Sequence, residues 1–296
     1  MMKALMHLDR SQVPRYIVYS TPGHYEFNKI KHLMAGYTRY EALIVGASGG
    51  RCGDALGSAS GERSYSCGGG GGGCIHIAGL LTELMDITEI EVGAKGVDGN
   101  NSTSAEAPAG DGGTGWETWF QYGPDEFFIA DGGSGANGGE YDAGLTRDML
   151  YPSMGGNGGA TSLVGLTTGA LGSGGAGGRA FMPDPDGNIA GTPAEAGIWE
   201  AAPPELYPVV GAGIGGGGGA GKVKRGSTIY DAAKTGAEGH LGGPYFALGQ
   251  AADTNDGGYG GGVNIDPFLA GTGAPLFQDA GSGHANGNGI VALKFS

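Results

Sequence analysis

The stretch of sequence that decides the fold is Gly211–Gly221 (GAGIGGGGGAG), together with the unbroken glycine run inside Cys67–Cys74 (CGGGGGGC). Both belong to a series of glycine-rich bursts in a chain of 296 residues that contains 68 Gly and 14 Pro. Glycine loses more backbone entropy on folding than any other residue and adds no side chain to a core. Such a chain either stays disordered or folds by packing backbone directly against backbone.

The rest of the composition argues against disorder. Charged residues make up only 16% of the chain and aromatic residues reach 8%, whereas disordered segments are usually highly charged and poor in aromatics. A collagen triple helix is excluded because the glycines keep no long G-x-y period and proline is sparse. We therefore expect an ordered protein with an unusual, glycine-based scaffold.

Charge and hydropathy exclude several classes of function. The formal net charge is −14, which argues against nucleic-acid binding because phosphate contacts need a basic face. No apolar run approaches the roughly 20 residues that span a bilayer. Neither a membrane span nor a signal peptide is expected, and the three cysteines are expected to be small buried thiols in a protein assembled in a reducing cytoplasm.

Glycine content changes abruptly near residue 45, which predicts an N-terminal strand segment, residues 1–45, and a glycine-rich domain, residues 46–296. Three segments rich in aromatic and acidic residues interrupt that domain, and we expect them to be loop inserts. They are 100–131, 179–210 and 244–256. Alternating apolar residues predict short strands, and Leu145–Leu150 and Tyr230–Lys234 read as single helical turns. The expected strands are Arg15–Ser20, His24–Ile30, Arg39–Val45, Cys74–Ala78, Ile87–Val92 and Gly289–Phe295.

The glycine bursts are expected to form polyglycine II helices, which have threefold symmetry and no internal hydrogen bonds. Neighbouring helices can then pair their N–H and C=O groups laterally, and this satisfies the buried backbone. Spacings of three occur, as in Gly93-Gly96-Gly99, but only slightly more often than random placement gives. The predicted fold class is therefore all-β and irregular: short N- and C-terminal strands, a polyglycine II bundle and almost no α-helix.

The sequence offers little for catalysis or for a cofactor. Gly216–Lys222 (GGGGAGK) matches a phosphate-binding loop, but Val223 stands where that motif needs Ser or Thr, and glycine-rich chains produce the match by chance. Cys67, Cys74 and His76 lack a fourth ligand for a zinc site. No Ser/His/Asp or similar constellation is apparent. We expect a non-enzyme with no cofactor and no bound metal.

The most distinctive local segment is Gly115–Phe128 (GWETWFQYGPDEFF), which concentrates aromatic and acidic residues. Aromatic faces can stack on sugars while carboxylates accept hydrogen bonds from hydroxyl groups. An alternative is that these rings form a small core or pack on another subunit, since large rings are usually buried. The candidate residues for contact with a host glycan are Trp116, Trp119, Phe120, Tyr122, Asp125 and Glu126.

Several motifs, in order along the chain, resemble the glycine-rich tail proteins of tailed bacteriophages, especially minor tail proteins of phages that infect actinobacteria. The sequence also resembles, more distantly, the glycine-rich adhesins of phage tail fibres. The three long inserts are where this sequence departs from the pattern. The motifs are Thr21-Pro22-Gly23 followed by HYEFNKI, ALIVGASGG at 42–50, GGGGGGCIHIAGL at 68–80, ITEIEVGAKG at 87–96, GNGGATS at 156–162 and GNGIVALKF at 287–295.

The resemblance implies a structural protein of the virion, at the tail tip, that contacts or recognises the host cell surface. It implies other tail proteins as partners, docking through residues 1–45, and a homo-oligomer for which we expect a trimer. Two other functions stay open at this point. One is a tail-associated enzyme that cleaves glycans, and the other is a free polyglycine-bundle protein that binds ice or belongs to a cell surface.

Overall fold

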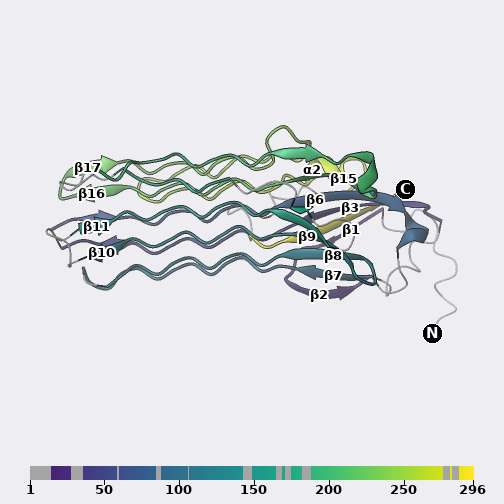
Figure 1. Ribbon diagram of the computed structural model, residues 1–296, viewed down its shortest axis with the longest axis horizontal. Helices are drawn as coiled ribbons and strands as arrows, with labels where there is room; N and C mark the ends of the chain where they lie inside the picture. The colour runs from purple at the N-terminus through teal and green to yellow at the C-terminus, as the bar shows by residue number, and fades with distance from the viewer. Residues whose placement is uncertain are drawn as a thin grey trace.

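The computed structural model is elongated, with two sheets at one end, a bundle of long irregular segments in the middle and short strands at the other end (Figure 1). We call the end with the two sheets the sandwich end and the end with the short strands the far end. The structure describes residues 15–27, 36–58, 60–84, 88–105, 107–142, 149–164, 169–170, 175–181, 188–275, 281 and 287–296.

Sheet A contains six antiparallel strands in the order β1-β18-β3-β6-β15-β14. Strand β3 has apolar residues on both faces because both faces of this sheet are covered. The strands are β1 Tyr16–Tyr19, β18 Ile290–Phe295, β3 Arg39–Val45, β6 Cys74–Leu80, β15 Val209–Gly213 and β14 Trp199–Ala201.

Sheet B packs on one face of sheet A and forms a sandwich with it. Its order is β13-β12-β9-β8-β7-β2, and the core between the sheets includes Tyr40 and Ile77 from sheet A and Ile90, Phe120 and Phe128 from sheet B. The strands are β13 Gly169–Ala170, β12 Thr161–Val164, β9 Glu126–Ala130, β8 Thr118–Gly123, β7 Glu89–Val92 and β2 Gly23–Glu26.

The other face of sheet A carries a second apolar cluster, in which Leu43 and Val45 meet Tyr245 and the only α-helix of the described residues, α2 (Asp266–Leu269). Two 3-10 turns, η3 Leu81–Glu83 and η4 Pro204–Leu206, also lie near the sandwich. The far end holds two small sheets: β17-β16-β5-β4, made of Thr228–Asp231, Val223–Arg225, Arg63–Ser64 and Ala55–Leu56, and β10-β11, made of Glu140–Asp142 and Met149–Tyr151.

The predicted fold class is confirmed, and the strand predictions at both ends of the chain agree with β1, β2, β3 and β18. The expected helical turn at Tyr230–Lys234 is wrong. That segment overlaps β17, which pairs with β16 across a tight turn in which Gly226 has a φ of 57°. The turn expected at Leu145–Leu150 lies outside the described residues except for its last two, which belong to β11.

The insert expected as a loop at 100–131 contains β8 and β9, two strands of the sandwich. The boundary expected at 45/46 coincides with the end of β3, after which the chain enters the bundle (Figure 1). Strands on both sides of that boundary share the same sheets, since β1 pairs with β18 and β2 pairs with β7.

The bundle is held by lateral backbone hydrogen bonds, and the segment Gly68–Gly73 shows their pattern best. Its N–H groups turn from one neighbouring segment to the next, and donors three residues apart reach the same segment, as polyglycine II symmetry requires. The bonds are Gly68 to the carbonyl of Gly219 (3.0 Å), Gly71 to Gly216 (2.9 Å), Gly70 to Ser134 (3.0 Å), Gly73 to Asp131 (2.9 Å) and Gly72 to Gly281 (2.9 Å).

The carbonyl groups of this segment are bonded in the same rotating manner by segments 46–52, 156–159 and 257–260. A Cβ added at any of the six glycines would lie closer than 3.0 Å to a backbone carbonyl oxygen of a neighbour. Every position is therefore glycine because this helix is enclosed on all sides and leaves no room for a side chain.

The segment 214–222 is the second enclosed helix. It exchanges backbone hydrogen bonds with six surrounding segments, of which 175–178 runs parallel to it and the other five run antiparallel. The surrounding segments are 65–71, 156–159, 175–178, 195–198, 234–240 and 255–261.

Helix 93–102 lies at the periphery of the bundle and keeps glycine at every third position only. A Cβ at Gly93, Gly96 or Gly99 would collide with backbone of segment 110–116. Val97 between them is 76% exposed. A period of three therefore marks a helix with one crowded face, and unbroken glycine marks an enclosed helix.

We call the bundle of laterally hydrogen-bonded segments the glycine lattice. We predict that Gly70→Ala strongly destabilises the protein, because the new Cβ would meet backbone atoms of Asn157 and Gly158 that cannot move independently of this lattice. The expected loss in the free energy of unfolding is about 3 kcal/mol or more, at the upper end of overpacking effects. Urea unfolding measures it. The control is Gly113→Ala, where the new Cβ would lie 3.0 Å from a methyl carbon and 3.1 Å from the backbone nitrogen of exposed Val97, so that a small shift relieves the contact. Equal losses in both variants would contradict the hydrogen-bonded bundle.

We also predict an acid-sensitive step from His240, which is completely buried. Burial lowers its pKa from 6.5 to about 4. Between pH 6.5 and pH 4, His240 is therefore protonated in the unfolded chain but neutral in the folded chain. The free energy of unfolding falls by about 3 kcal/mol as the pH decreases across this range.

The measurement is urea unfolding across this pH range, compared with His240→Asn. Asparagine tolerates the positive φ of 54° at this position and does not titrate there, so the variant should show a flatter pH dependence. Identical pH profiles for the two proteins would contradict the prediction.

Candidate functional site

The aromatic segment divides between the two faces of sheet B because successive residues of a strand point in opposite directions. Phe120 and Phe128 point inward and are completely buried in the core between the sheets. Trp119 and Phe127 point outward, and their rings form an edge-to-face pair with centroids 5.4 Å apart. The segment thus contributes rings both to the buried core and to the outer face of sheet B.

A cavity of about 460 Å³ lies beside this outward face and contains two of the predicted residues, Trp116 and Trp119. Two carboxylates, those of Glu91 and Glu117, line the same cavity. The other lining residues are Pro22, Gly23, Val92, Gly93 and Ala94, from the turn before β2 and from the end of β7. We call this the tryptophan cavity.

Trp116 is the most exposed aromatic residue among those described, with 71% of its surface accessible. Its backbone is fixed from two sides, since its N–H donates to the carbonyl of Ala94 (3.0 Å) and its carbonyl accepts from the N–H of Ala47 (3.2 Å). The glycine lattice therefore holds an exposed indole ring at the point where the bundle meets the sandwich.

His24 joins the site from β2, which pairs with β7 at the edge of sheet B. Its ring lies edge-on to Trp119, with centroids 5.8 Å apart. Nδ1 lies 3.2 Å from the Glu91 carboxylate and Nε2 lies 3.7 Å from the Glu89 carboxylate. Imidazole, indole and carboxylates thus form one continuous polar and aromatic surface.

The remaining predicted residues lie elsewhere. Phe120 is inaccessible in the core, and Tyr122 is half-buried with its ring 5.5 Å from that of Phe128. Burial raises the pKa of the Tyr122 hydroxyl. Asp125 lies in the turn between β8 and β9 and Glu126 begins β9, both at the end of β8 away from Trp116, and neither lines the tryptophan cavity.

Sequence reasoning missed His24, Glu91 and Glu117. Glu117 stands inside the aromatic segment and was overlooked in favour of Asp125 and Glu126. His24 and Glu91 are 67 residues apart, and only the pairing of β2 with β7 brings them together. The alternation of His24-Tyr25-Glu26 and Glu89-Ile90-Glu91 predicts which faces these residues occupy, but not that the two strands are neighbours.

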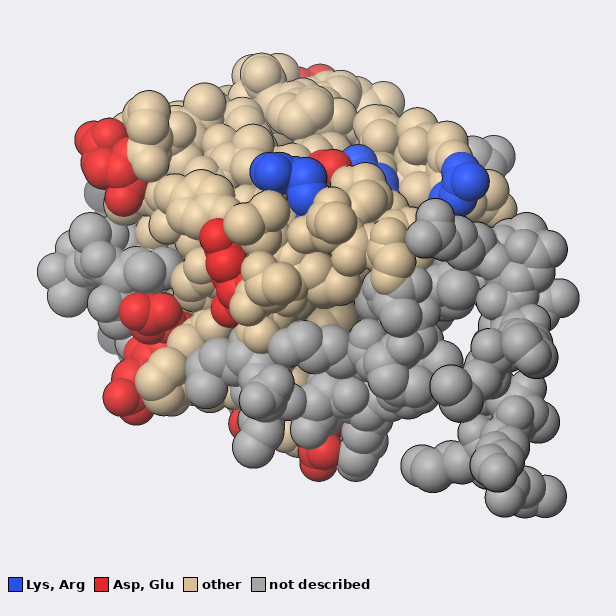
Figure 2. All heavy atoms as spheres, turned by 90° about the vertical axis from the view of Figure 1, so that its right-hand side faces the viewer, with Lys and Arg blue, Asp and Glu red and all other residues tan. Residues whose placement is uncertain are grey.

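A view onto the sandwich end shows how charge is distributed there (Figure 2). Most of the visible Asp and Glu side chains lie along the left side and in the lower half, whereas the visible Lys and Arg side chains lie in the upper half. Sheet B is the lower of the two sheets in this orientation (Figure 1). Among the described residues, the end face that this view shows is therefore acidic on the sheet B side.

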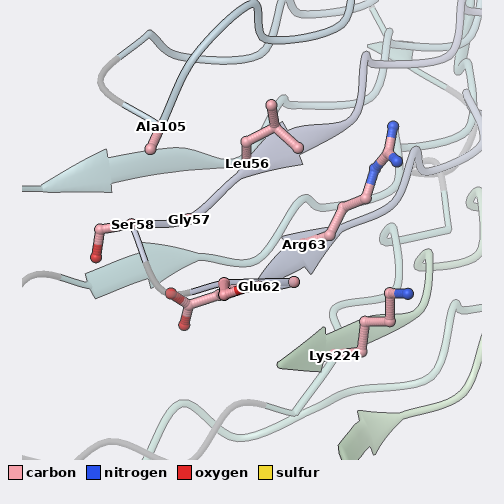
Figure 3. Close-up of a pocket in the computed structure, with 9 residues that line it drawn as sticks. Leu56, Gly57, Ser58, Glu62, Arg63, Ala105 and Lys224 are labelled. Atoms are coloured by element: carbon pink, nitrogen blue, oxygen red, sulfur yellow. The ribbon is translucent and has the colours of Figure 1, made fainter. Parts of the chain in front are cut away.

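A second depression, of about 350 Å³, lies at the far end (Figure 3). Arg63 on β5 and Lys224 on β16 extend in one direction, while the Glu62 carboxylate points in another. Arg63 is already paired with Asp54 at 2.7 Å, and no aromatic ring lines the depression. It offers less for ligand recognition than the tryptophan cavity.

The phosphate-loop match at Gly216–Lys222 does not form an anion cradle. The N–H groups of Gly216, Gly217, Gly218 and Gly219 all donate to backbone carbonyls of neighbouring segments, at 2.7–3.0 Å. No N–H of this glycine run is left to bind a phosphate. The motif is therefore a segment of the glycine lattice that ends in a lysine by chance.

The three cysteines are free and buried, as expected. Two of them serve the lattice, because the Sγ atoms of Cys52 and Cys67 accept hydrogen bonds from the N–H groups of Cys67 and Gly221, each at 3.1 Å. Within the described ranges, no three His, Cys, Asp or Glu side chains cluster as a metal site. No described helix has the length and apolar character to cross a membrane.

Comparison of the chain with models of protein families gives no match, and comparison with curated proteins gives no significant match.

We predict that Trp116→Ala changes the free energy of unfolding by less than about 0.5 kcal/mol, because the ring is mostly exposed. Phe120→Ala should cost about 3–5 kcal/mol, because it opens a cavity in the core between the sheets. Urea unfolding of both variants measures the difference. A large loss for Trp116→Ala would mean that this ring is structural rather than available to a ligand.

Proposed function

We propose that this protein is a structural minor tail protein of a tailed bacteriophage, located at the tail tip of the virion, where it contacts the host cell surface. The order of motifs from Thr21-Pro22-Gly23 to GNGIVALKF at 287–295 supports the assignment to a phage tail. The net charge of −14 agrees with this role, because it disfavours nucleic-acid partners.

The scaffold suits such a role mechanically. Lateral hydrogen bonds run in several directions around each enclosed helix, so a force on one segment is shared by its neighbours. The bundle of long segments separates the sandwich end from the far end (Figure 1). A rigid spacer of this kind fits a protein that presents surfaces outward from a particle.

The observation that carries host contact is the exposed indole of Trp116 beside Trp119, Glu91 and Glu117 in one preformed cavity. Indole faces stack on the apolar faces of sugar rings, and carboxylates accept hydrogen bonds from sugar hydroxyl groups. The host component that this cavity fits best is a surface glycan. We propose that the protein binds this glycan without cleaving it.

Cleavage of the glycan is the second candidate, because Glu91 and Glu117 line the same cavity and glycosidases use two carboxylates. An assay for new reducing ends on host wall polysaccharides separates the two roles. Release of reducing ends that stops in Glu91→Gln or Glu117→Gln would establish the enzyme, and binding without release supports the structural role.

Docking to the tail and oligomerisation belong to the same proposal. Strands β1, β2 and β3 are built into the two sheets, so docking through the described part of residues 1–45 would engage the sandwich. A trimer remains our expectation for the assembled state.

The proposal predicts that antibodies raised against the purified protein label the tail tip of particles in electron micrographs. It also predicts that the purified protein slows adsorption of those particles to host cells, since it would occupy their receptors, while Trp116→Ala competes less well. Absence of the protein from purified particles would overturn the assignment.

A further inference from the structure

The tryptophan cavity is one-sided in charge. Its lining includes the carboxylates of Glu91 and Glu117 and no lysine or arginine. Glu89 adds a third carboxylate, 3.7 Å from His24. The nearby cation Lys95 is engaged elsewhere, since its Nζ donates to the hydroxyl of Tyr259 (3.0 Å) and lies 3.4 Å from Asp98.

Within the described residues, no lysine or arginine pairs with the carboxylates of the cavity. The partners that the structure shows for Glu91 and Glu89 include only the imidazole of His24 as a possible cation, and Glu117 has no ion pair in the described part of the chain. Glu117 is exposed, and the side chains of Glu89 and Glu91 keep 39% and 34% of their surface accessible. An anionic ligand would be repelled here, whereas a cation would be attracted.

The aromatic surfaces add to the same preference. The face of an indole ring attracts cations through its quadrupole, and tryptophan is the strongest of the aromatic side chains in this respect. Trp116 and Trp119 line the cavity together with the carboxylates. A ligand that combines an apolar ring face with a positive charge would satisfy both kinds of group at once.

The site is arranged before a ligand arrives. The backbone of Trp116 is fixed by two hydrogen bonds, and the ring of Trp119 is held between the rings of His24 and Phe127, at 5.8 and 5.4 Å. Glu91 is held by His24 at 3.2 Å. The side chains of Trp119 and Glu91 therefore lose little freedom on binding, which favours affinity for a small ligand.

We infer that the tryptophan cavity recognises a saccharide that carries a protonated amino group, such as a hexosamine unit that lacks its N-acetyl group. One sugar face packs on the indole rings, and the ammonium group lies between the rings and the carboxylates of Glu91 and Glu117. This inference rests on the proposed glycan contact and narrows it to cationic sugars, excluding uronate, sialate and phosphate-bearing polymers.

Isothermal titration calorimetry with the purified full chain tests the inference, with three probes of equal length: a glucosamine oligomer, an N-acetylglucosamine oligomer and a galacturonate oligomer. At about pH 6 and low salt, the glucosamine oligomer should bind at least about tenfold more tightly than the N-acetylated one. The galacturonate oligomer should not bind. The preference should shrink as salt rises, because the carboxylates are solvent-accessible.

Variants assign the effect to the cavity. Trp116→Ala and Trp119→Ala should each abolish binding of the glucosamine oligomer. The double variant Glu91→Gln/Glu117→Gln should bind the glucosamine and N-acetylglucosamine oligomers with similar affinity. Ile229→Ala is the control, because Ile229 is 59% exposed at the far end. A thermal melt of each variant checks that it is folded.

Equal or tighter binding of the N-acetylated or the galacturonate oligomer would overturn the inference, as would the absence of glucosamine binding. Oligolysine is the control for simple attraction to a chain of charge −14; if it binds as tightly and displaces the sugar, recognition is not of a saccharide. These outcomes leave the tail assignment standing, because that assignment fails only if the protein is missing from particles.

Discussion

The structure depends on one interaction: lateral hydrogen bonding between backbone N–H and C=O groups of neighbouring extended segments. In an ordinary sheet these bonds lie in a plane, so side chains can occupy the two faces. In the bundle the donors of Gly68–Gly73 rotate from neighbour to neighbour, and no face is left for a side chain. Glycine is required because any Cβ in this run would meet a carbonyl oxygen.

This constraint also explains where side chains are found. The sandwich strands continue directly into the bundle, and at that point the chain changes from a period of two, with alternating faces, to a period of three. β3 ends at Val45, and Gly46 already donates to Gly73 across the lattice at 2.9 Å. Large side chains are therefore confined to the ends and the periphery, which is why the candidate site lies at the junction of bundle and sandwich.

The lattice was predictable in kind from sequence, and so were β3 and β18, because apolar runs between turns and glycines mark them clearly. The threefold period was statistically weak for a physical reason: the enclosed runs Gly68–Gly73 and Gly215–Gly219 have glycine at every position, whereas the peripheral helix 93–102 displays the spacing. Trp116 and Trp119, which the sequence singled out from their segment, both line the tryptophan cavity. Phe120 was not separable from them without knowing the strand direction, and His24 joins them only through the pairing of β2 with β7.

The claim that the glycine runs are a hydrogen-bonded lattice is tested most directly by amide hydrogen exchange resolved to single residues. The account predicts that the amides of Gly68–Gly73 and Gly215–Gly219 exchange as slowly as those of β3 and β6, because each donates to a buried carbonyl or lies enclosed among neighbours. Exchange of these glycine amides at the rate of an unstructured peptide, while β3 and β6 stay protected, would contradict it.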